Sequence, residues 1–438
     1  MTISSFLKMS RRALLATAVL VAGAATALAD PAKIDFWTEF SAAPEKPVLD
    51  EIVADFNKAN PDIQVVHTGF ENTPYETTLK TSFAGGNPAD IVELNGGSNM
   101  FQYAEAGGLL DISHFVTERK ELIAPGLESW YTFGGKQYGV PLGLSVGNLL
   151  WYNKDMLAAQ GIDPESLRTW DGMRAAAKKF KDAGIAPIVF GNSEGWTGNH
   201  IFNHLTLRLL GAEQYVALAL QTFDPSVKPT TNWSSPEAVK AWELYKSLLD
   251  DGLFTAGYLS DDYPTASNLF LTSKAPLFSM GPWFLGNIES TAPNGNFGVM
   301  AFPAVEGVPG KQTDLVTNGL VVTITKTSKN PDQAKKFLDY LMSEPVQKKW
   351  SEATLRLLPY TYDTSTWKYS ARAKEVAALM AGATNAVAFL DMIEDQKCIA
   401  QWVNAPSQGI LSGGITPSDA AKGHDECAAQ MRKDKGFK

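Results

Sequence analysis

Aromatic and polar side chains stand at the ends of two strands that the sequence predicts, where they could bind a small molecule. Trp37 and Glu39 lie at the end of the extended run that begins at residue 33, and Asn95 and Gly96 close the apolar run at residues 90–94. In an open α/β sheet, ligands bind at the carboxyl ends of the strands. Carboxylates and amides can hydrogen-bond to hydroxyl groups, and aromatic rings can cover an apolar face. The pattern indicates noncovalent binding, and for Glu39 a solvated loop carboxylate is the alternative.

A G-x-S-x-G motif spans residues 143–147 and places Ser145 where a hydrolase would carry its nucleophile. That motif requires a strand before the serine and a helix directly after it, because the sharp turn between them exposes the hydroxyl. Here residues 149–152 continue as a second extended, apolar run. A secreted esterase is therefore the weaker interpretation of this segment.

His200 and His204 have the four-residue spacing of two metal ligands on one helix face. No H-E-x-x-H motif accompanies them, and no cysteine or third histidine lies nearby in the sequence, so helix packing is the favoured interpretation. His200 could still reach a ligand. A glycosidase needs two carboxylates that face one bond. Acidic residues at 261–262 and 391–395 are candidates by residue type alone. The sequence has no Walker or dinucleotide motif, and no cofactor is expected.

The first 29 residues predict export. Lys8, Arg11 and Arg12 precede an apolar run at residues 13–28, and Ala-Leu-Ala at residues 27–29 is a small-residue cleavage site. The run is short for a membrane-spanning helix, so a retained anchor is the weaker alternative. The paired arginines leave both Sec and twin-arginine export open. The mature protein is therefore expected in the periplasm.

The size and charge of the chain limit its architecture and its partners. Removal of the leader would leave 409 of 438 residues, which suits two domains better than one core. The net charge of −9 becomes −12 once the three basic leader residues are removed. An acidic body argues against nucleic acid and against anionic membrane surfaces as partners, because both require basic faces.

Two cysteines, Cys398 and Cys427, are present. In an oxidising compartment a lone pair is more often bridged than free, and closing a loop of about 30 residues would add roughly 3 kcal/mol of stability in the chain-entropy model. Neither belongs to a C-x-x-C motif for redox or metal chemistry. A structural disulfide is predicted, with two buried thiols as the alternative.

Strand-like and helix-like segments alternate along the rest of the chain. Apolar spacing predicts helices over residues 46–60, 75–84, 170–183, 200–220, 236–249, 264–272 and 331–343. Extended runs are expected at 33–37, 63–66, 90–94, 145–152, 188–190, 275–280, 297–301 and 319–324, and the tail from residue 374 is expected to be mostly helical. This alternation predicts α/β units over largely parallel sheets. Two domains without a linker suggest several crossings between them.

Six motifs in order carry a resemblance to a known family. They are Gly-Asn-Pro-Ala-Asp-Ile at 86–91, Tyr-Gly-Val-Pro at 138–141, Trp-Tyr-Asn-Lys-Asp at 151–155, Thr-Trp-Asp at 169–171, Ser-Met-Gly-Pro-Trp-Phe at 279–284, and Asn-Gly-Leu-Val-Val at 318–322 followed by Ser-Lys-Asn-Pro at 328–331 and a helix through residue 350. With these motifs the chain, leader excluded, resembles the extracellular solute-binding proteins of carbohydrate ABC importers, the group that includes maltose-binding protein.

This resemblance implies a type II periplasmic-binding-protein fold, with two α/β lobes that each contain a mostly parallel sheet. The first lobe would comprise residues 30–141 with 304–341, and the second residues 143–296 with 346–438. Hinge crossings are expected near 142–149, 297–303 and 342–345. A ligand that contacts both lobes would favour a closed state, which ABC permease subunits with a cytoplasmic ATPase would recognise. The protein is expected to be a monomer and not an enzyme.

The resemblance also implies further binding residues. Trp283 would be a stacking platform for a sugar ring, and Trp196 stands in a polar, glycine-rich loop where a ligand role is natural. Core packing is the alternative for both. The other candidates are Ser145 and Asn148 at the first crossing, Asn318 and Gly319 facing the cleft, and Arg356, which could hold a hydroxyl pair or an anionic group or form a surface salt bridge.

Three functional interpretations stay open. A neutral mono- or oligosaccharide or a polyol would be bound through hydroxyl-matching polar groups, which discriminate strongly because an unmatched buried polar group is costly. The same fold could bind an anionic relative, such as an acidic sugar or a glycerol phosphate. The third interpretation is a secreted hydrolase.

Overall fold

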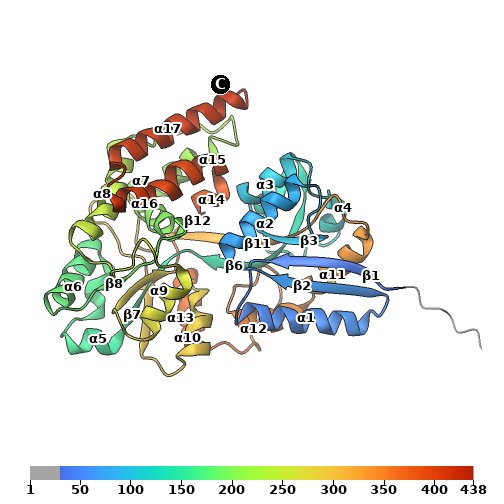
Figure 1. The fold of residues 1–438 in the computed structure, drawn as a ribbon, viewed down its shortest axis with the longest axis horizontal. Coiled ribbons are helices and arrows are strands. Elements are labelled where there is room, and N and C mark those ends of the chain that lie inside the picture. The colour runs from blue at the N-terminus through green and yellow to red at the C-terminus, as the bar shows by residue number, and fades with distance from the viewer. Residues whose placement is uncertain (1–29, 438) are drawn as a thin grey trace, which may run out of the picture.

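The computed structural model describes residues 30–437, which form two α/β lobes side by side (Figure 1). The predicted leader, residues 1–29, lies outside the described residues. The first lobe carries β1–β3 and helices α1–α4, α11 and α12, and the second carries most of the remaining elements. The predicted two-lobed α/β fold is confirmed.

The first lobe is built on a sheet of six strands in the order β12-β11-β3-β1-β2, with β6 paired to β11. The strands are β1 (Ala32–Thr38), β2 (Ile63–Gly69), β3 (Ile91–Asn95), β6 (Gly139–Val146), β11 (Leu315–Ile324) and β12 (Ala386–Ala388). The pairs β1–β2, β1–β3 and β11–β12 are parallel, whereas β11 is antiparallel to both β3 and β6. The sheet is therefore more mixed than the sequence predicted.

Helices cover this sheet and complete its core. They are α1 (Glu45–Ala59), α2 (Asn72–Ala84), α3 (Ser98–Glu105), α4 (Ser113–Thr117), α11 (Pro331–Met342) and α12 (Glu344–Thr354), with a 3-10 turn at Glu128–Trp130 before the hairpin of β4 (Thr132–Phe133) and β5 (Lys136–Gln137). Phe337 of α11 contacts both Phe36 of β1 and Phe56 of α1 edge to face. The apolar spacing that predicted α1 and α11 therefore corresponds to their buried faces.

The second lobe has a sheet in the order β10-β7-β9-β8, formed by β7 (Leu149–Asn153), β8 (Ile188–Val189), β9 (Leu277–Met280) and β10 (Phe297–Ala301). Only β8–β9 is parallel here, so the expectation of a mostly parallel sheet is wrong for this lobe. The helices are α5 (Lys154–Ala159), α6 (Trp170–Asp182), α7 (Trp196–Leu220), α8 (Pro236–Asp250), α9 (Tyr263–Leu271), α10 (Phe284–Thr291) and α13 (Ala371–Ala381), with a 3-10 turn at Pro164–Arg168.

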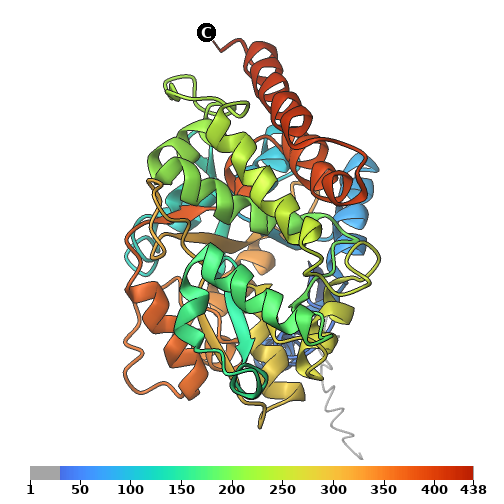
Figure 2. The same ribbon diagram turned by 90° about the vertical axis from the view of Figure 1, so that its left-hand side faces the viewer.

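The C-terminal segment adds α14 (Leu390–Ile393), α15 (Gln396–Ile399), a π turn (Ala400–Asn404), α16 (Ala405–Ser412) and α17 (Pro417–Asp434) to the second lobe. Figure 2 looks onto this lobe, with the long helix α17 at the top. Among residues 30–437, none of the helices combines the length and the apolar character that crossing a membrane would require.

Two residues of the sequence motifs, Asp90 and Thr169, form hydrogen bonds that connect or cap elements of the fold. Asp90, at the start of β3, accepts hydrogen bonds from the Asp35 backbone N–H at 3.0 Å and from the Ser328 hydroxyl at 2.6 Å. It therefore ties β1, β3 and the loop after β11 into one unit. Thr169 caps α6 by accepting from the N–H of Gly172 at 3.1 Å, which satisfies one of the free donors at the start of that helix.

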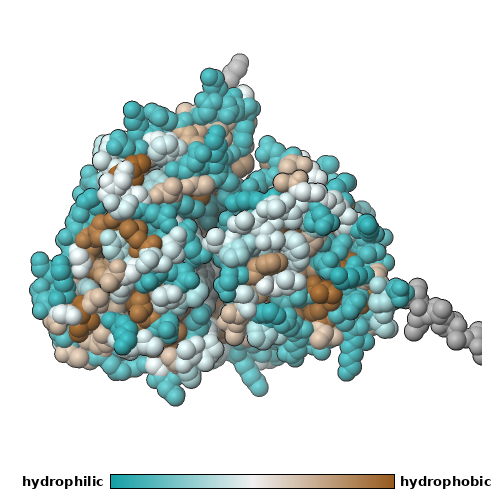
Figure 3. Space-filling view, viewed as in Figure 1, coloured by the Kyte–Doolittle hydropathy of each residue, from teal (hydrophilic) through white to brown (hydrophobic). Residues whose placement is uncertain are grey.

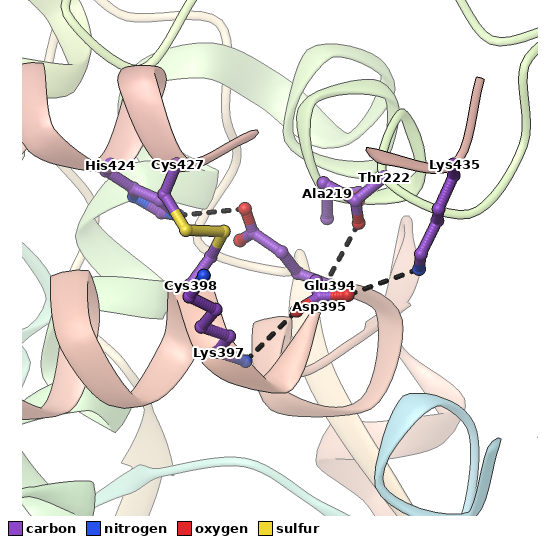
Figure 4. The surroundings of a disulfide bond; sticks show 9 residues. All are labelled: Ala219, Thr222, Glu394, Asp395, Lys397, Cys398, His424, Cys427 and Lys435. Atoms are coloured by element: carbon purple, nitrogen blue, oxygen red, sulfur yellow. Dashed lines mark hydrogen bonds and ion pairs between the residues drawn. A yellow bond between two sulfur atoms is a disulfide. The ribbon is translucent and has the colours of Figure 1, made fainter. Parts of the chain in front are cut away.

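The predicted disulfide is confirmed: Cys398 and Cys427 are bridged, with their Cα atoms 5.6 Å apart (Figure 4). The bridge joins α15 to α17. Beside it, a hydrogen bond of 2.9 Å joins Oε1 of Glu394 to Nε2 of His424, and both side chains are fully buried. Lys435 forms an ion pair with Asp395 at 3.2 Å. These links attach the segment after β12 firmly to the C-terminal helix.

The chain passes between the lobes where sheet partners change. The first passage is short, because β6 pairs in the first sheet and β7, three residues later, pairs in the second. Residues 302–314 are held by the second lobe, where the buried guanidinium of Arg208 donates to the backbone carbonyls of Phe302, Pro303, Gln312 and Asp314. We therefore propose that the second crossing lies at the start of β11, later than residues 297–303.

The third passage also differs from the expected position. The helix α12 packs on α1 in the first lobe, whereas α13 packs on β10 in the second. Residues 346–354 were expected in the second lobe. Their buried side chains Val346 and Trp350 belong instead to the first-lobe core. We propose that this crossing lies between α12 and α13, and that β12 returns briefly to the first sheet.

Candidate ligand-binding cleft

A groove separates the surfaces of the two lobes in the space-filling view (Figure 3). The lobes touch at several points along it. The Thr73 hydroxyl at the start of α2 donates to Glu194 of the second lobe at 2.6 Å, and Ser98 of α3 donates to the backbone carbonyl of Asp391 at 2.9 Å. A methyl group on Gly286 of α10 would lie 2.6 Å from the ring of Pro44. The structure therefore presents the lobes in contact across the groove.

Four of the predicted residues come together on the second-lobe wall: Asn148, Trp196, His200 and Trp283. The imidazole of His200 lies 5.0 Å from the ring of Trp196 and 6.0 Å from that of Trp283, between ring centroids, and it stacks on Phe389 at 4.1 Å. Both tryptophans are half-buried.

Polar contacts orient this wall. The Asn148 side chain is fully buried and donates to the backbone carbonyl of Ser279 at 3.2 Å, while its carbonyl oxygen lies 3.2 Å from Nδ1 of His200. Burial lowers the pKa of His200 to about 3, so the imidazole is uncharged at neutral pH. Trp196 donates its indole N–H to Glu194 at 3.1 Å, the same carboxylate that meets Thr73 of the first lobe.

The first-lobe wall contains Asn95 and Gly96 at the end of β3 and Asn318 and Gly319 within β11. Gly96 donates its N–H to the Gly319 carbonyl at 2.8 Å, and Asn318 lies opposite Ser145 in the β6–β11 register. The half-buried Trp130 covers both glycines: a methyl group on Gly319 would lie 1.7 Å from its indole ring, and one on Gly96 would lie 3.0 Å from its Cβ and 3.1 Å from its backbone carbonyl. At Gly319 the indole occupies the space that a side chain would need, whereas the contacts at Gly96 are tight but involve the Cβ and the backbone of Trp130.

Trp37 and Glu39 follow β1 as predicted, and both are half-buried. The Glu39 carboxylate accepts from the amide of Asn72 at 2.7 Å, and its backbone N–H donates to the carboxylate of Glu93 at 3.2 Å. Burial raises the pKa of Glu39 against the opposing charge of Arg356. Glu39 and Glu93 line one small pocket together with Tyr75, Asn95 and other residues of the first lobe.

Arg356 is buried and not part of a surface salt bridge. Its guanidinium donates to Glu45 at 3.2 Å, with 7% and 12% of the two side chains exposed, and it lies 5.1 Å from the ring centre of Phe40. Its Nε has no hydrogen-bond partner within residues 30–437. A ligand role for Arg356 stays a prediction.

The two enzyme-like motifs have structural surroundings unlike those of the enzymes. Ser145 lies within β6, and the chain continues into β7 without an intervening helix, so the strand-turn-helix geometry of a nucleophile elbow is missing at this position. The Ser145 hydroxyl is buried and donates to its neighbour's carbonyl at 3.3 Å. His204 is fully buried and stacks on Phe302 at 4.7 Å.

Several cleft residues were not predicted. Trp130, Phe389 and Glu93 were missed, and Asp391 was noted only as part of an acidic run. For Glu93 a signal existed, because an acidic residue inside the apolar run Ile-Val-Glu-Leu is unusual in a buried strand. Trp130 and Phe389 carry no comparable local signal, since only the fold brings them to the cleft.

With the geometry in place, comparisons with known proteins identify the family. The profile of the family described as bacterial extracellular solute-binding protein matches residues 42–348. The chain belongs to this family. A putative binding protein of Brucella abortus is 27% identical over 385 residues, which cover 86% of this chain and 87% of the relative. A probable sugar-binding periplasmic protein of Rhizobium meliloti is 25% identical over 296 residues, covering 67% and 68%.

Solved structures share the fold. A structure from work on xylan utilisation by Caldanaerobius polysaccharolyticus has a TM-score of 0.81 at 22% identity, covering 90% of this chain and 99% of that chain. A chitin oligosaccharide binding protein has a TM-score of 0.80, also at 22% identity, covering 92% and 100%. At this identity the likeness establishes the architecture, and the ligand has to be argued from the cleft itself.

Proposed function

We propose that the protein is the extracytoplasmic substrate-binding component of an ABC importer and that it captures a carbohydrate between its lobes. The observation that carries this proposal is that one wall of the cleft is aromatic and the opposite wall is polar. Trp196 and Trp283 offer ring faces on one side, and Asn95, Asn318 and Glu39 offer planar polar groups on the other. A sugar has an apolar C–H face and polar edges, which matches such a cleft.

The comparisons support the same ligand class. The Rhizobium meliloti relative is described as sugar-binding, and the chitin oligosaccharide binding protein shares the fold over nearly the whole chain. Export of the protein to the periplasm, its delivery of ligand to permease subunits and its action as a monomer belong to this proposal. So does the interpretation that it binds without catalysing a reaction, which fits a family of solute-binding proteins.

Closure of the groove would be the signal that the permease recognises. Contacts between the lobes, such as Thr73 with Glu194, are weak individually, and a ligand that touches both walls adds binding energy only in the closed state. The ligand therefore shifts the population towards closure, which is how binding would be coupled to transport.

A thermal-shift screen tests the proposal. The mature protein is heated with sugars, polyols and sugar phosphates, alongside the variant Trp283→Ala. A ligand at 100 times its Kd should add about 2.7 kcal/mol of stability, and the variant should lose most of that gain because the stacking surface is removed. A screen in which peptides or metal ions stabilise the protein and carbohydrates do not would refute the carbohydrate proposal.

A further inference from the structure

Carboxylates from both lobes face the same part of the cleft. Glu39 and Glu93 meet at the ends of β1 and β3, where the Glu39 N–H donates to Oε2 of Glu93 at 3.2 Å. Glu76 of α2 lines the same small pocket. From the second lobe, Asp391 approaches the start of α3, whose Asn99 lines that pocket: the Asp391 backbone carbonyl accepts from the Ser98 hydroxyl at 2.9 Å, and its buried Oδ1 has no hydrogen-bond partner within residues 30–437. Burial, with the charges of Glu76 and Glu39, raises the pKa of Asp391 to about 7. Four acidic groups therefore converge where a ligand would lie.

The positive charges near this cluster are already engaged. Arg356 donates to Glu45, and Lys80 pairs with Glu76 at 3.4 Å from an exposed position. Within residues 30–437, no lysine or arginine forms an ion pair with Glu39, Glu93 or Asp391. Lys80 also lines the pocket, and the charge of Arg356 opposes the rise in the pKa of both Glu39 and Glu93. Neither side chain forms an ion pair with Glu39, Glu93 or Asp391, so these three groups offer hydrogen-bond acceptors without a directly paired cation.

Glu93 is an independent sign of a missing partner. Its side chain is fully buried, and while one carboxylate oxygen accepts the Glu39 N–H, the other, Oε1, has no hydrogen-bond partner in the described chain. A buried carboxylate oxygen without a donor is costly. Burial and the charge of Glu39 raise the pKa of Glu93 well above its ordinary value, which shows how poorly this environment accommodates the negative charge.

A ligand would relieve this cost only if it brought donors. An ammonium group supplies three N–H donors and a positive charge, whereas a neutral sugar supplies hydroxyls that donate one hydrogen each. An anionic sugar would add repulsion at close range. Charge-assisted hydrogen bonds are also about twice as strong as neutral ones.

We propose that the cleft selects a carbohydrate with a cationic amino group, seated between Glu93, Glu39 and Asp391. This inference rests on the proposed function for the rest of the ligand. It also ranks the two ligand classes that the sequence left open: a neutral carbohydrate is favoured over an anionic one. The amino group defines a subsite beside the tryptophans, with the carbohydrate ring extending towards Trp196 and Trp283.

The test is calorimetric titration with four matched series: D-glucosamine, N-acetyl-D-glucosamine, D-glucose and D-glucuronate, each also as β-1,4-linked oligomers. The amine series should bind about tenfold or more tightly than its neutral counterparts. In Glu93→Gln, this preference should fall below about twofold. The control Glu118→Gln removes an exposed carboxylate of the same lobe and should keep the wild-type preference.

The outcomes separate the two proposals. Equal or tighter binding of the neutral or uronate series would overturn the cationic subsite while keeping the carbohydrate. If Glu93→Gln kept the full preference for the amine series, the placement of the amino group beside Glu93 would be wrong. Spermidine serves as a cation without a sugar ring: its binding, with no carbohydrate bound, would overturn the proposed carbohydrate function and keep the cation site. Failure of every amine to bind would overturn the cation site.

Discussion

The contact between Trp130 and Gly319 allows a quantitative test of the cleft's architecture. The substitution Gly319→Ala adds a methyl group whose carbon would lie 1.7 Å from the indole ring, far inside van der Waals contact. The carbonyl of Trp130 also accepts a hydrogen bond from the N–H of Gly97 at 2.7 Å, which holds the main chain of Trp130 in place, so the indole must rotate or the strand must shift to admit the methyl group. Overpacking of this kind costs about 1–3 kcal/mol.

A double-mutant cycle isolates this contact. Gly319→Ala should lower the free energy of unfolding by about 1–3 kcal/mol in the wild-type background. In a Trp130→Ala background the same substitution should cost little, because the space above Gly319 is then free. Chemical denaturation followed by circular dichroism measures all four proteins. Gly382→Ala is the control, since a methyl group there lies 3.4 Å from the nearest atom and should be almost neutral.

The same variants report on the ligand site. If Trp130 lies beside the bound sugar, its displacement in Gly319→Ala should weaken carbohydrate binding as well as folding. The reasoning would be refuted if Gly319→Ala were as stable as wild type, or if its cost were the same with and without Trp130. Either result would mean that the indole does not rest on this glycine.

Three further predictions follow from individual contacts. Replacement of Cys398 and Cys427 by serine should lower the free energy of unfolding by about 3 kcal/mol, and reducing agent should then have no further effect on the denaturation midpoint. Thr73→Val removes a hydrogen bond to the charged carboxylate of Glu194; it should weaken ligand binding about fivefold in calorimetry, since about 1 kcal/mol of closed-state stabilisation is lost, and unchanged affinity would exclude this contact from closure. Burial, with the charges of Glu76 and Glu39, raises the pKa of Asp391 from its ordinary value to about 7. Because the folded protein then keeps a proton that the unfolded chain releases, stability falls as pH rises from about 4 to 7 and levels off above. The stability of Asp391→Asn relative to wild type should therefore grow over this range in denaturation at stepped pH, and a flat difference would contradict the buried placement.

Local pattern was enough to predict most of the architecture. The helices α1, α6, α8 and α11 and the strands β1–β3 were expected close to their observed positions, because each buries a regular apolar face. The disulfide was predicted from compartment and cysteine count. The strand β12 lies in a tail that was expected to be helical. With only three residues it has almost no pattern of its own and forms by pairing with β11.

Features that depend on tertiary contacts were harder to predict. Residues 302–314 are bonded to the second lobe by one buried arginine, Arg208, which donates to the carbonyls of Phe302 and Asp314, and nothing in the local sequence indicates these bonds. Gly211 interrupts the helix expected at residues 200–220 with a φ of 75°. A single glycine in an apolar helical run is weak evidence for such a kink.

The candidate site shows the same division. Trp283, which the resemblance implied, lies near Trp196 and His200, which were proposed from their own surroundings in the sequence; contact of the three with a ligand is still a prediction. The acidic cluster was missed because Glu93 and Asp391 lie in segments that are nearly 300 residues apart in the sequence and that approach each other only through the contact between Ser98 and Asp391. Their importance comes from buried carboxylate oxygens that have no hydrogen-bond partner within residues 30–437, which is a property of the fold.

The most direct test of the central claim is one calorimetric titration of the best carbohydrate from the stabilisation screen into the mature wild-type protein. The account predicts saturable binding of one ligand per chain, with each injection returning to the baseline because the ligand is held and not converted. Sustained heat after each injection would reveal turnover and favour a hydrolase. The absence of any binding heat across the carbohydrates would contradict the assignment of the cleft as a sugar site.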